Sequence, residues 1–92
     1  MDLVSEAVIF AAKAHDGMRR KQSNTPYIMH PLEAAVIVST MTDDQHTISA
    51  AALHDVVEDT TVTLDQIDEK FGSRVALLVA SETENKRADL PP

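Results

Sequence analysis

Apolar side chains recur at helical spacing through the first half of the chain. Over residues 2–15 one stripe, at the spacing of an amphipathic helix, contains Leu3, Ala7, Phe10, Ala11 and Ala14. Gly17 is typical of a helix end, and the polar residues 19–25 predict a loop. Pro31 suits the first turn of a second helix. The residues after Pro31 are apolar on nearly every side, so we expect this second helix to be central.

Three further helices follow, each with a recognisable start. Residues 42–44 supply N-cap candidates for a third helix that runs to Asp59, with a packing stripe of Ile48, Ala51, Ala52 and Val56. Thr63 and Gln66 have the spacing of a capping box for a short fourth helix, and Ser73 can cap a fifth. The sequence therefore predicts an all-α bundle of five helices with no sheet.

The composition limits the domain organisation and the location of the protein. The 92 residues, 43% of them hydrophobic, support one domain with one core. The chain has no cysteine, which excludes disulfides and thiolate metal sites. Its first residues are acidic where a signal peptide is basic, and no apolar run approaches the roughly 20 residues of a membrane span. We expect a cytoplasmic protein.

The charge is negative overall but positive in one short segment. A formal net charge of −7 argues against binding to nucleic acid or an anionic membrane surface, because both depend on clustered Lys and Arg. Arg19, Arg20 and Lys21 are nevertheless contiguous, and Lys13 lies one helical face away. This local cationic patch is compatible with a small anionic ligand.

The end of the predicted third helix is acidic. Asp55, Glu58 and Asp59 gather within one turn, although each carboxylate at a helix C-terminus costs about 0.3–1 kcal/mol. His54 is at i,i+4 spacing from Glu58, so all four side chains can share one broad face. A solvated helix end with a core histidine explains the pattern as well as a bound cation does. If a cation is bound, imidazole and carboxylate together suit Zn²⁺, Mn²⁺ or Fe²⁺ rather than Ca²⁺.

His30 is a second candidate metal ligand. It precedes Pro31, which favours extended backbone geometry at the N-cap of the second helix. The positive helix end disfavours imidazolium, and neutral imidazole is the form that binds metal. Taken alone, a histidine packed at a helix start is the simpler interpretation.

Five short motifs stand in order along the chain: Lys13-Ala14-His15-Asp16-Gly17, Arg20-Lys21, Thr25-Pro26-Tyr27-Ile28-Met29-His30-Pro31-Leu32, Ala51-Ala52-Leu53-His54-Asp55-Val56-Val57-Glu58-Asp59-Thr60 and Phe71-Gly72. In this order and spacing they make residues 5–86 resemble the hydrolase (HD) domain of the RelA/SpoT homologues and their small alarmone hydrolases. The resemblance implies an HD-domain helical bundle that hydrolyses the 3′-pyrophosphate of ppGpp or pppGpp, giving GDP or GTP and pyrophosphate.

The resemblance also implies a metal centre. His30, His54 and Asp55 match three ligands of the family's single divalent metal ion, usually Mn²⁺. Glu58 and Asp59 match the pair that orients or deprotonates the attacking water. The metal ion lowers the pKa of that water and polarises the phosphoryl oxygens.

The resemblance also implies that basic residues bind the substrate. Arg20 and Lys21 match a loop that packs against the guanine base, and Lys86 falls in a polar, substrate-side loop, where it is a candidate phosphate-binding residue. Residues 22–24 differ from the family's Gly-containing form, so an HD phosphohydrolase for another nucleotide is an alternative. We interpret His15 as structural and His46 as solvated.

One part of the family's metal site is absent from the 92 residues. The family adds an Asp on a later helix in an Ala-Asp-Lys-like context, whereas Asp89 here follows the fifth helix too closely to replace it. We therefore expect residues 1–92 to be the N-terminal part of a single HD domain. The chain alone should bind Mn²⁺ weakly, hydrolyse alarmones negligibly, and either oligomerise or be marginally stable. The non-enzymatic alternatives are a nucleotide-binding regulatory module and an inactive folded fragment.

Overall fold

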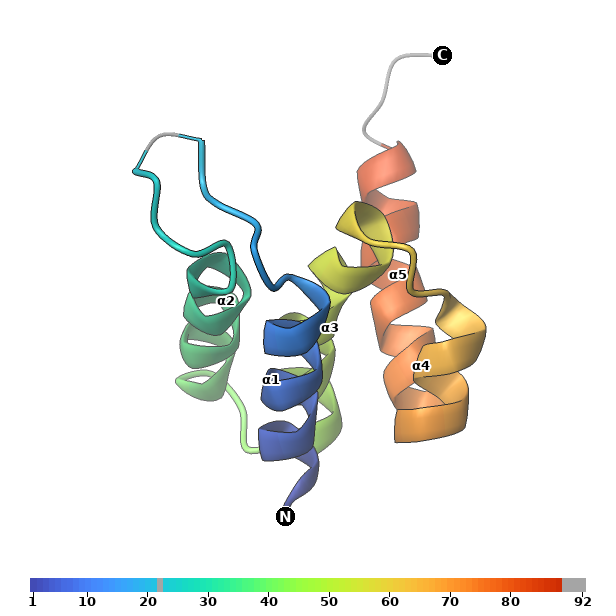
Figure 1. Ribbon diagram of the computed structural model, residues 1–92. Helices are drawn as coiled ribbons and strands as arrows, with labels where there is room; N and C mark the ends of the chain where they lie inside the picture. Colours follow the sequence, from blue (N-terminus) through green and yellow to red (C-terminus); the bar gives the residue numbers. More distant parts are fainter. Residues whose placement is uncertain (22, 89–92) are drawn as a thin grey trace.

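The computed structural model describes residues 1–21 and 23–88, with side chains up to residue 82. This part of the chain forms five helices, α1 (Leu3–Ala14), α2 (Met29–Ser39), α3 (Gln45–Asp59), α4 (Leu64–Phe71) and α5 (Ser73–Ala88) (Figure 1). The only β pairing in the described residues is an isolated bridge between Arg19 and Pro26. The predicted all-α fold is therefore confirmed. None of the described helices combines the length and the hydrophobicity needed to cross a bilayer.

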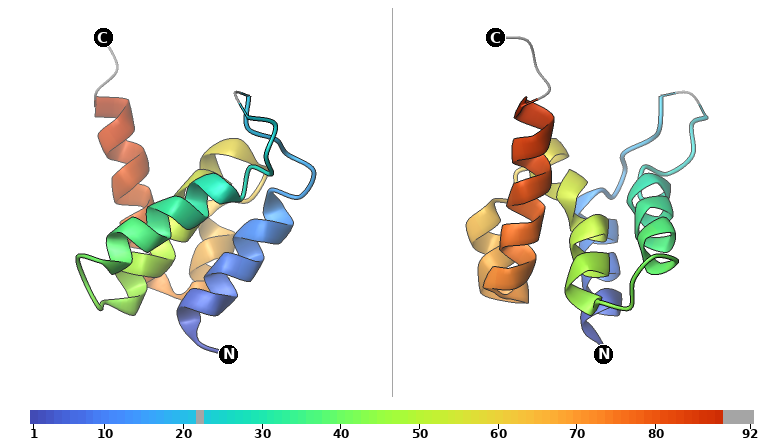
Figure 2. Two further views of the ribbon diagram at one scale, coloured as in Figure 1. Left: turned by 90° about the vertical axis from the view of Figure 1, so that its left-hand side faces the viewer. Right: turned by 180° about the vertical axis from the view of Figure 1, so that it is seen from behind.

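The central helix is α3. It packs against α1, α2 and α5, while α4 packs against α5 (Figures 1 and 2). Its buried residues are Ile48, Ser49, Ala50, Ala52, Leu53, Asp55 and Val56. Small side chains lie among larger ones on this surface, which lets the neighbouring helices approach α3 closely.

Our prediction that the second helix is central is wrong. α2 buries only Pro31 and Ala35, whereas Val36 and Ile37 are 62% and 60% exposed. An all-round apolar helix is buried only where other elements surround it. α2 lies at one edge of the bundle, where it packs against α3 (Figure 2).

Large apolar side chains remain exposed on α1, α2 and α5, and the most exposed of them lie on α2 and α5. Val36 and Ile37 lie on α2, and Leu77, on α5, is 70% exposed. Exposed apolar surface of this kind favours association.

The predicted extended geometry of His30 is also wrong, because α2 begins before Pro31. The helix starts at Met29, and its N-cap residue Ile28 has helical dihedral angles. Proline lacks an N–H, but amides of the first turn have no partner within the helix, so the helix can include Pro31 there. The His30 N–H donates instead to the Tyr27 carbonyl at 3.0 Å, in a tight turn that leads into the helix. His30 therefore lies in the first turn of α2.

The predicted capping box of α4 is confirmed. The Thr63 hydroxyl accepts from the Gln66 N–H at 3.2 Å, and the Gln66 side-chain oxygen accepts from the Thr63 N–H at 2.9 Å. At its other end α4 stops at Gly72, whose φ of 97° is readily available only to glycine. The box and the glycine together define both ends of this eight-residue helix.

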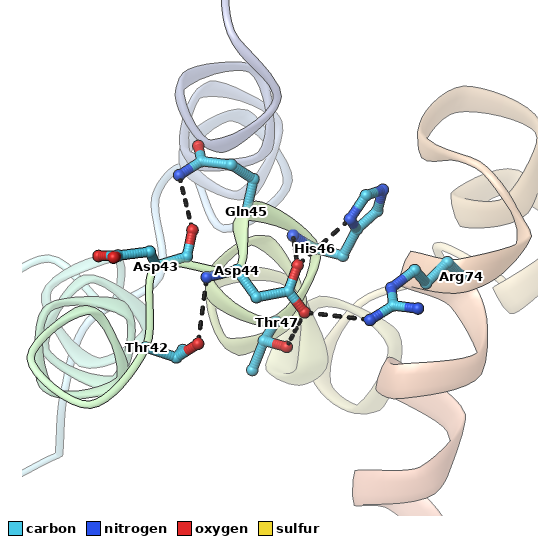
Figure 3. Close-up of polar contacts among 7 residues, drawn as sticks. All are labelled: Thr42, Asp43, Asp44, Gln45, His46, Thr47 and Arg74. Atoms are coloured by element: carbon cyan, nitrogen blue, oxygen red, sulfur yellow. Dashed lines mark hydrogen bonds and ion pairs between the residues drawn. The ribbon is translucent and has the colours of Figure 1, made fainter.

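Asp44 caps α3 and connects it to α5 (Figure 3). Its Oδ1 accepts from the His46 N–H at 3.2 Å, and its Oδ2 accepts from the Thr47 hydroxyl at 2.7 Å and from the Arg74 guanidinium at 3.3 Å. The Thr47 hydrogen bond, helped by Arg74 and opposed by burial, holds the pKa of Asp44 well below its ordinary value of 3.8. One carboxylate thus fixes the start of the central helix.

Replacing Asp44 with Ala should lower the thermal unfolding midpoint by about 4 °C, because the variant loses a helix cap and the Arg74 contact. A carboxylate whose pKa is lowered on folding stabilises the fold above its unfolded pKa, and this contribution disappears as it is protonated. The difference between wild type and Asp44→Ala should therefore shrink as the pH falls below 3.8. Thermal melts followed by circular dichroism measure both effects.

Asp43→Ala is the matched control, since the Asp43 carboxylate points away from this network in Figure 3. The assignment of Asp44 as the cap of α3 would be contradicted if both variants lowered the unfolding midpoint equally. It would also be contradicted if the difference between wild type and Asp44→Ala did not change with pH.

Candidate active site

The connection between α1 and α2 doubles back on itself. The Arg20 N–H donates to the Thr25 carbonyl and the Tyr27 N–H to the Met18 carbonyl, each at 2.8 Å. The loop stands at the same end of the bundle as the C-terminal end of α3 (Figures 1 and 2). It thereby brings Tyr27 and the start of α2 beside the acidic end of the central helix.

Asp55 is the centre of the candidate site. Its side chain is only 3% exposed; its Oδ2 lies 3.0 Å from His30 Nε2, and its Oδ1 lies 3.1 Å from His54 Nε2. His30 comes from α2, whereas His54 and Asp55 are consecutive on α3. The packing of these two helices therefore brings the three candidate metal ligands together.

The hydrogen bond of His54 defines which ring nitrogen faces Asp55. His54 Nδ1 lies 3.1 Å from the Ala51 carbonyl oxygen, and because a carbonyl only accepts, Nδ1 carries the proton. In the neutral ring Nε2 then holds the lone pair, 3.1 Å from Asp55 Oδ1. A lone pair facing a carboxylate oxygen is repulsive unless a proton or a metal ion lies between them. Metal-bound histidines commonly donate their other N–H to a carbonyl in this way.

The three donors are paired rather than gathered about one point. Within the described part of the chain, no three His, Asp or Glu side chains are grouped so that they could hold an ion as they stand. Two ligands of a tetrahedral ion with bonds of about 2.1 Å lie about 3.4 Å apart. The observed N–O distances of 3.0 and 3.1 Å are close to this separation. The donor types and the N–O spacing within each pair thus resemble those of a divalent metal site.

Glu58 and Asp59 are exposed at the end of α3. Asp59 Oδ2 accepts a hydrogen bond of 2.8 Å from the Tyr27 hydroxyl. The Tyr27 ring also contacts the edge of His30, with centroids 5.9 Å apart. Burial, followed by the bond to Asp59, raises the pKa of Tyr27 above its ordinary value of 10.0, so the hydroxyl stays protonated as a donor. Tyr27 therefore joins Asp59 to the helix start that carries His30.

Arg20 and Lys21 line a pocket beside these residues. The pocket has a volume of about 260 Å³, and among the described residues Tyr27 and His30 also line it. Arg20 Nη1 lies 3.1 Å from Glu33 Oε1, and both side chains are partly exposed. The two basic residues predicted to bind substrate thus border the same pocket as a candidate metal ligand.

Lys13 and Lys86 are the other two basic residues that the sequence singled out. Lys13 lines a separate pocket with Phe10 and Lys70, so it does not extend the cationic patch of the loop. Our prediction that Lys86 lies in a loop after the fifth helix is wrong, because its backbone belongs to α5. Its side chain lies outside the described residues.

His15 lies closer to the site than we expected from the sequence. It is 2% exposed, and its ring centroid is 4.9 Å from that of Tyr27. Burial lowers the pKa of His15, while the carboxylates of Asp59 and Asp55 raise it. Neither His15 nor Tyr27 was a candidate site residue. Their presence in the motifs with Arg20 and His30 was the signal that could have indicated them.

Comparison with known proteins identifies relatives of the whole chain. The family model described as HD domain matches residues 7–90. A GTP pyrophosphokinase rsh of Brucella ovis is 42% identical over 88 residues, which make up 96% of this chain and 12% of that protein. A guanosine-3′,5′-bis(diphosphate) 3′-pyrophosphohydrolase of Aquifex aeolicus is 42% identical over 81 residues, which make up 88% of this chain and 12% of that protein. The chain thus spans a small part of the length of these relatives.

A solved structure has the same fold. It is described as "A metazoan ortholog of SpoT hydrolyzes ppGpp and plays a role in starvation responses". It matches with a TM-score of 0.83 and 32% sequence identity, covering 96% of this chain and 56% of that chain. The predicted HD-type helical fold and the resemblance to the RelA/SpoT homologues are confirmed. The chain belongs to the HD domain family.

Proposed function

We propose that this chain forms part of a metal-dependent phosphohydrolase site that removes the 3′-pyrophosphate of ppGpp or pppGpp, giving GDP or GTP and pyrophosphate. The observation that carries the proposal is the buried Asp55 carboxylate, faced by the Nε2 atoms of His30 and His54. The names of the relatives support the substrate. One is named as a 3′-pyrophosphohydrolase of guanosine bis(diphosphate), and the solved relative is said to hydrolyse ppGpp.

His30, His54 and Asp55 would hold the metal ion, for which Mn²⁺ is our first choice. Two imidazoles and a carboxylate suit Mn²⁺, Zn²⁺ or Fe²⁺, and a cation would relieve the contact between the His54 lone pair and Asp55. When bound, the ion supplies an acidified water and polarises the phosphoryl oxygens. Asp55 contributes a negative charge that is already buried, and the Ala51 carbonyl holds the His54 ring in its orientation.

Glu58 and Asp59 would act on the attacking water. Each lies one helical turn beyond a ligand, Glu58 after His54 and Asp59 after Asp55, so both project on the same side as the ligands. Both are exposed, and water can therefore reach them. A carboxylate in this place can orient a water or accept its proton over a distance of about 2.6–3.2 Å.

The pocket of Arg20 and Lys21 would bind the nucleotide. Its basic side chains attract an anion to a protein whose net charge is −7. The planar guanidinium of Arg20 can stack on a purine base. Because His30 also lines this pocket, a nucleotide bound there lies next to the proposed metal ion. Lys86 is a further candidate for contact with a phosphate.

A nucleotide-binding module without catalysis is the second candidate function. It is favoured by one observation, that no three donors in the described residues are gathered about a common point. Such a module would bind the nucleotide through the basic pocket and leave it intact. Hydrolysis measurements separate the two functions directly.

In the full-length protein, His54→Ala and Asp55→Ala should each abolish Mn²⁺ binding measured by titration calorimetry, because each removes a ligand. In the full-length protein the same changes should abolish pyrophosphate release. Glu58→Gln should keep the metal ion and lower turnover by on the order of 10²–10⁴, because it removes only a group that acts on water.

His46→Ala is the control for this series, since His46 lies at the other end of α3 beside Asp44. Unchanged Mn²⁺ affinity in both His54→Ala and Asp55→Ala would refute the metal site. Loss of the ion in Glu58→Gln would make Glu58 a ligand.

Arg20→Ala should raise KM for ppGpp about tenfold and leave kcat almost unchanged, because a contact to the base is made equally in the ground state and the transition state. Steady-state kinetics of the full-length protein measure both constants. Arg19→Ala is the matched control, because Arg19 is the neighbouring basic residue but does not line the pocket. Equal KM values for wild type and Arg20→Ala would show that Arg20 does not contact the nucleotide and that the loop is simply exposed to solvent.

A further inference from the structure

We propose that Tyr27 is a positioning residue that fixes the Asp59 carboxylate for the water-activating step. This inference rests on the proposed function. It assigns separate roles to the two carboxylates at the end of α3, with Asp59 as the one whose orientation is set by Tyr27.

The hydrogen bond from Tyr27 to Asp59 joins two separate segments of the chain. The Tyr27 hydroxyl, from the loop before α2, donates to Asp59 Oδ2 at 2.8 Å across a sequence separation of 32 residues. A hydroxyl bond to a carboxylate is short and stronger than one between neutral groups. Asp59 is the last residue of α3 and is exposed, a place where helix ends fray and side chains keep their rotational freedom. The bond restricts that freedom.

The Tyr27 ring is itself held from two sides. Its centroid lies 4.9 Å from that of His15 and 5.9 Å from that of His30. His15 is buried directly after α1, and His30 lies in the first turn of α2. The phenol therefore sits where three helices meet, and tilted or edge contacts of this kind stabilise one ring orientation. The hydroxyl position follows from the packing of α1, α2 and α3.

The bond leaves one oxygen of the Asp59 carboxylate available to a water. With Oδ2 engaged by Tyr27, the second oxygen of Asp59 is directed by the same contact and can accept a hydrogen bond from a water. A water held in this orientation should react faster, because small errors in the position of reacting groups reduce rates strongly. Tyr27 also lines the pocket of Arg20 and Lys21. A direct contact of Tyr27 with the nucleotide is therefore the competing explanation, and it would act on KM.

Absorption spectroscopy tests the hydrogen bond without any assay of activity. Tyr27 is the single tyrosine of the chain, and there is no tryptophan, so the long-wavelength near-ultraviolet absorption band reports this phenol alone. In the native 92-residue chain, Asp59→Ala should shift the phenol band, because the bond to the carboxylate is lost. The control Asp43→Ala, which removes a carboxylate beside the start of α3, should leave the band in place. A band that is the same in wild type and Asp59→Ala would overturn the proposal.

A double-mutant cycle tests the positioning role in the full-length protein. Tyr27→Phe keeps the ring between His15 and His30 and removes only the hydroxyl, so it should lower kcat about tenfold and leave KM unchanged. In an Asp59→Ala background the same change should have no further effect on kcat, because Tyr27 acts through Asp59. In an Arg20→Ala background its effect on kcat should remain in full.

The outcomes separate this proposal from the proposed function. An effect on KM alone would make Tyr27 a substrate contact, and an equal loss of kcat with and without Asp59 would show that it acts elsewhere; either result overturns the proposal. A wild-type protein that binds ppGpp without turnover would overturn the proposed function, and with it the catalytic role of Tyr27. The band shift would still show whether Tyr27 holds Asp59.

Discussion

The buried carboxylate of Asp55 is the constraint on which the rest of the site depends. A carboxylate that is 3% exposed is costly to bury unless positive charge or hydrogen-bond donors surround it. Here the groups that face it are imidazole nitrogens from two helices. Leu53 and Val56, on the same helix, are completely buried, so Asp55 cannot turn to solvent without disrupting the core. The fold therefore keeps the Asp55 carboxylate at a fixed point between the two imidazole rings.

The central position of α3 explains how a small domain can support such a site. The same helix supplies the core residues between α1, α2 and α5 and carries His54, Asp55, Glu58 and Asp59 at its last turns. Its start is fixed by the Asp44 network with Arg74 of α5, and its end by Tyr27 of the α1–α2 loop. The cap at one end and the proposed site at the other thus belong to one helix, and side chains on a rigid element keep their geometry.

Much of the fold was predictable because its signals are local. The caps at Asp44 and Thr63 depend on a few neighbouring residues, and the five helices follow from the spacing of apolar side chains. The prediction that α2 is central was wrong because the hydrophobicity of a helix does not determine which elements surround it. The predicted start of α2 was wrong because a proline in the first turn of a helix does not prevent the residues before it from being helical.

The candidate site was predictable only in part for a similar reason. His54 and Asp55 are adjacent in the sequence, and the motifs added His30, but the contacts of Tyr27 with Asp59 and His15 cross between segments that no local pattern connects. These contacts of Tyr27 are therefore visible only in the folded structure.

The central claim is that His30, His54 and Asp55 hold one metal ion, and anomalous X-ray diffraction from crystals grown with Mn²⁺ tests it most directly. We expect a single strong peak about 2.0–2.3 Å from Nε2 of His30, from Nε2 of His54 and from an Asp55 oxygen. Crystals in which Mn²⁺ binds elsewhere, while both rings remain against Asp55, would contradict the claim.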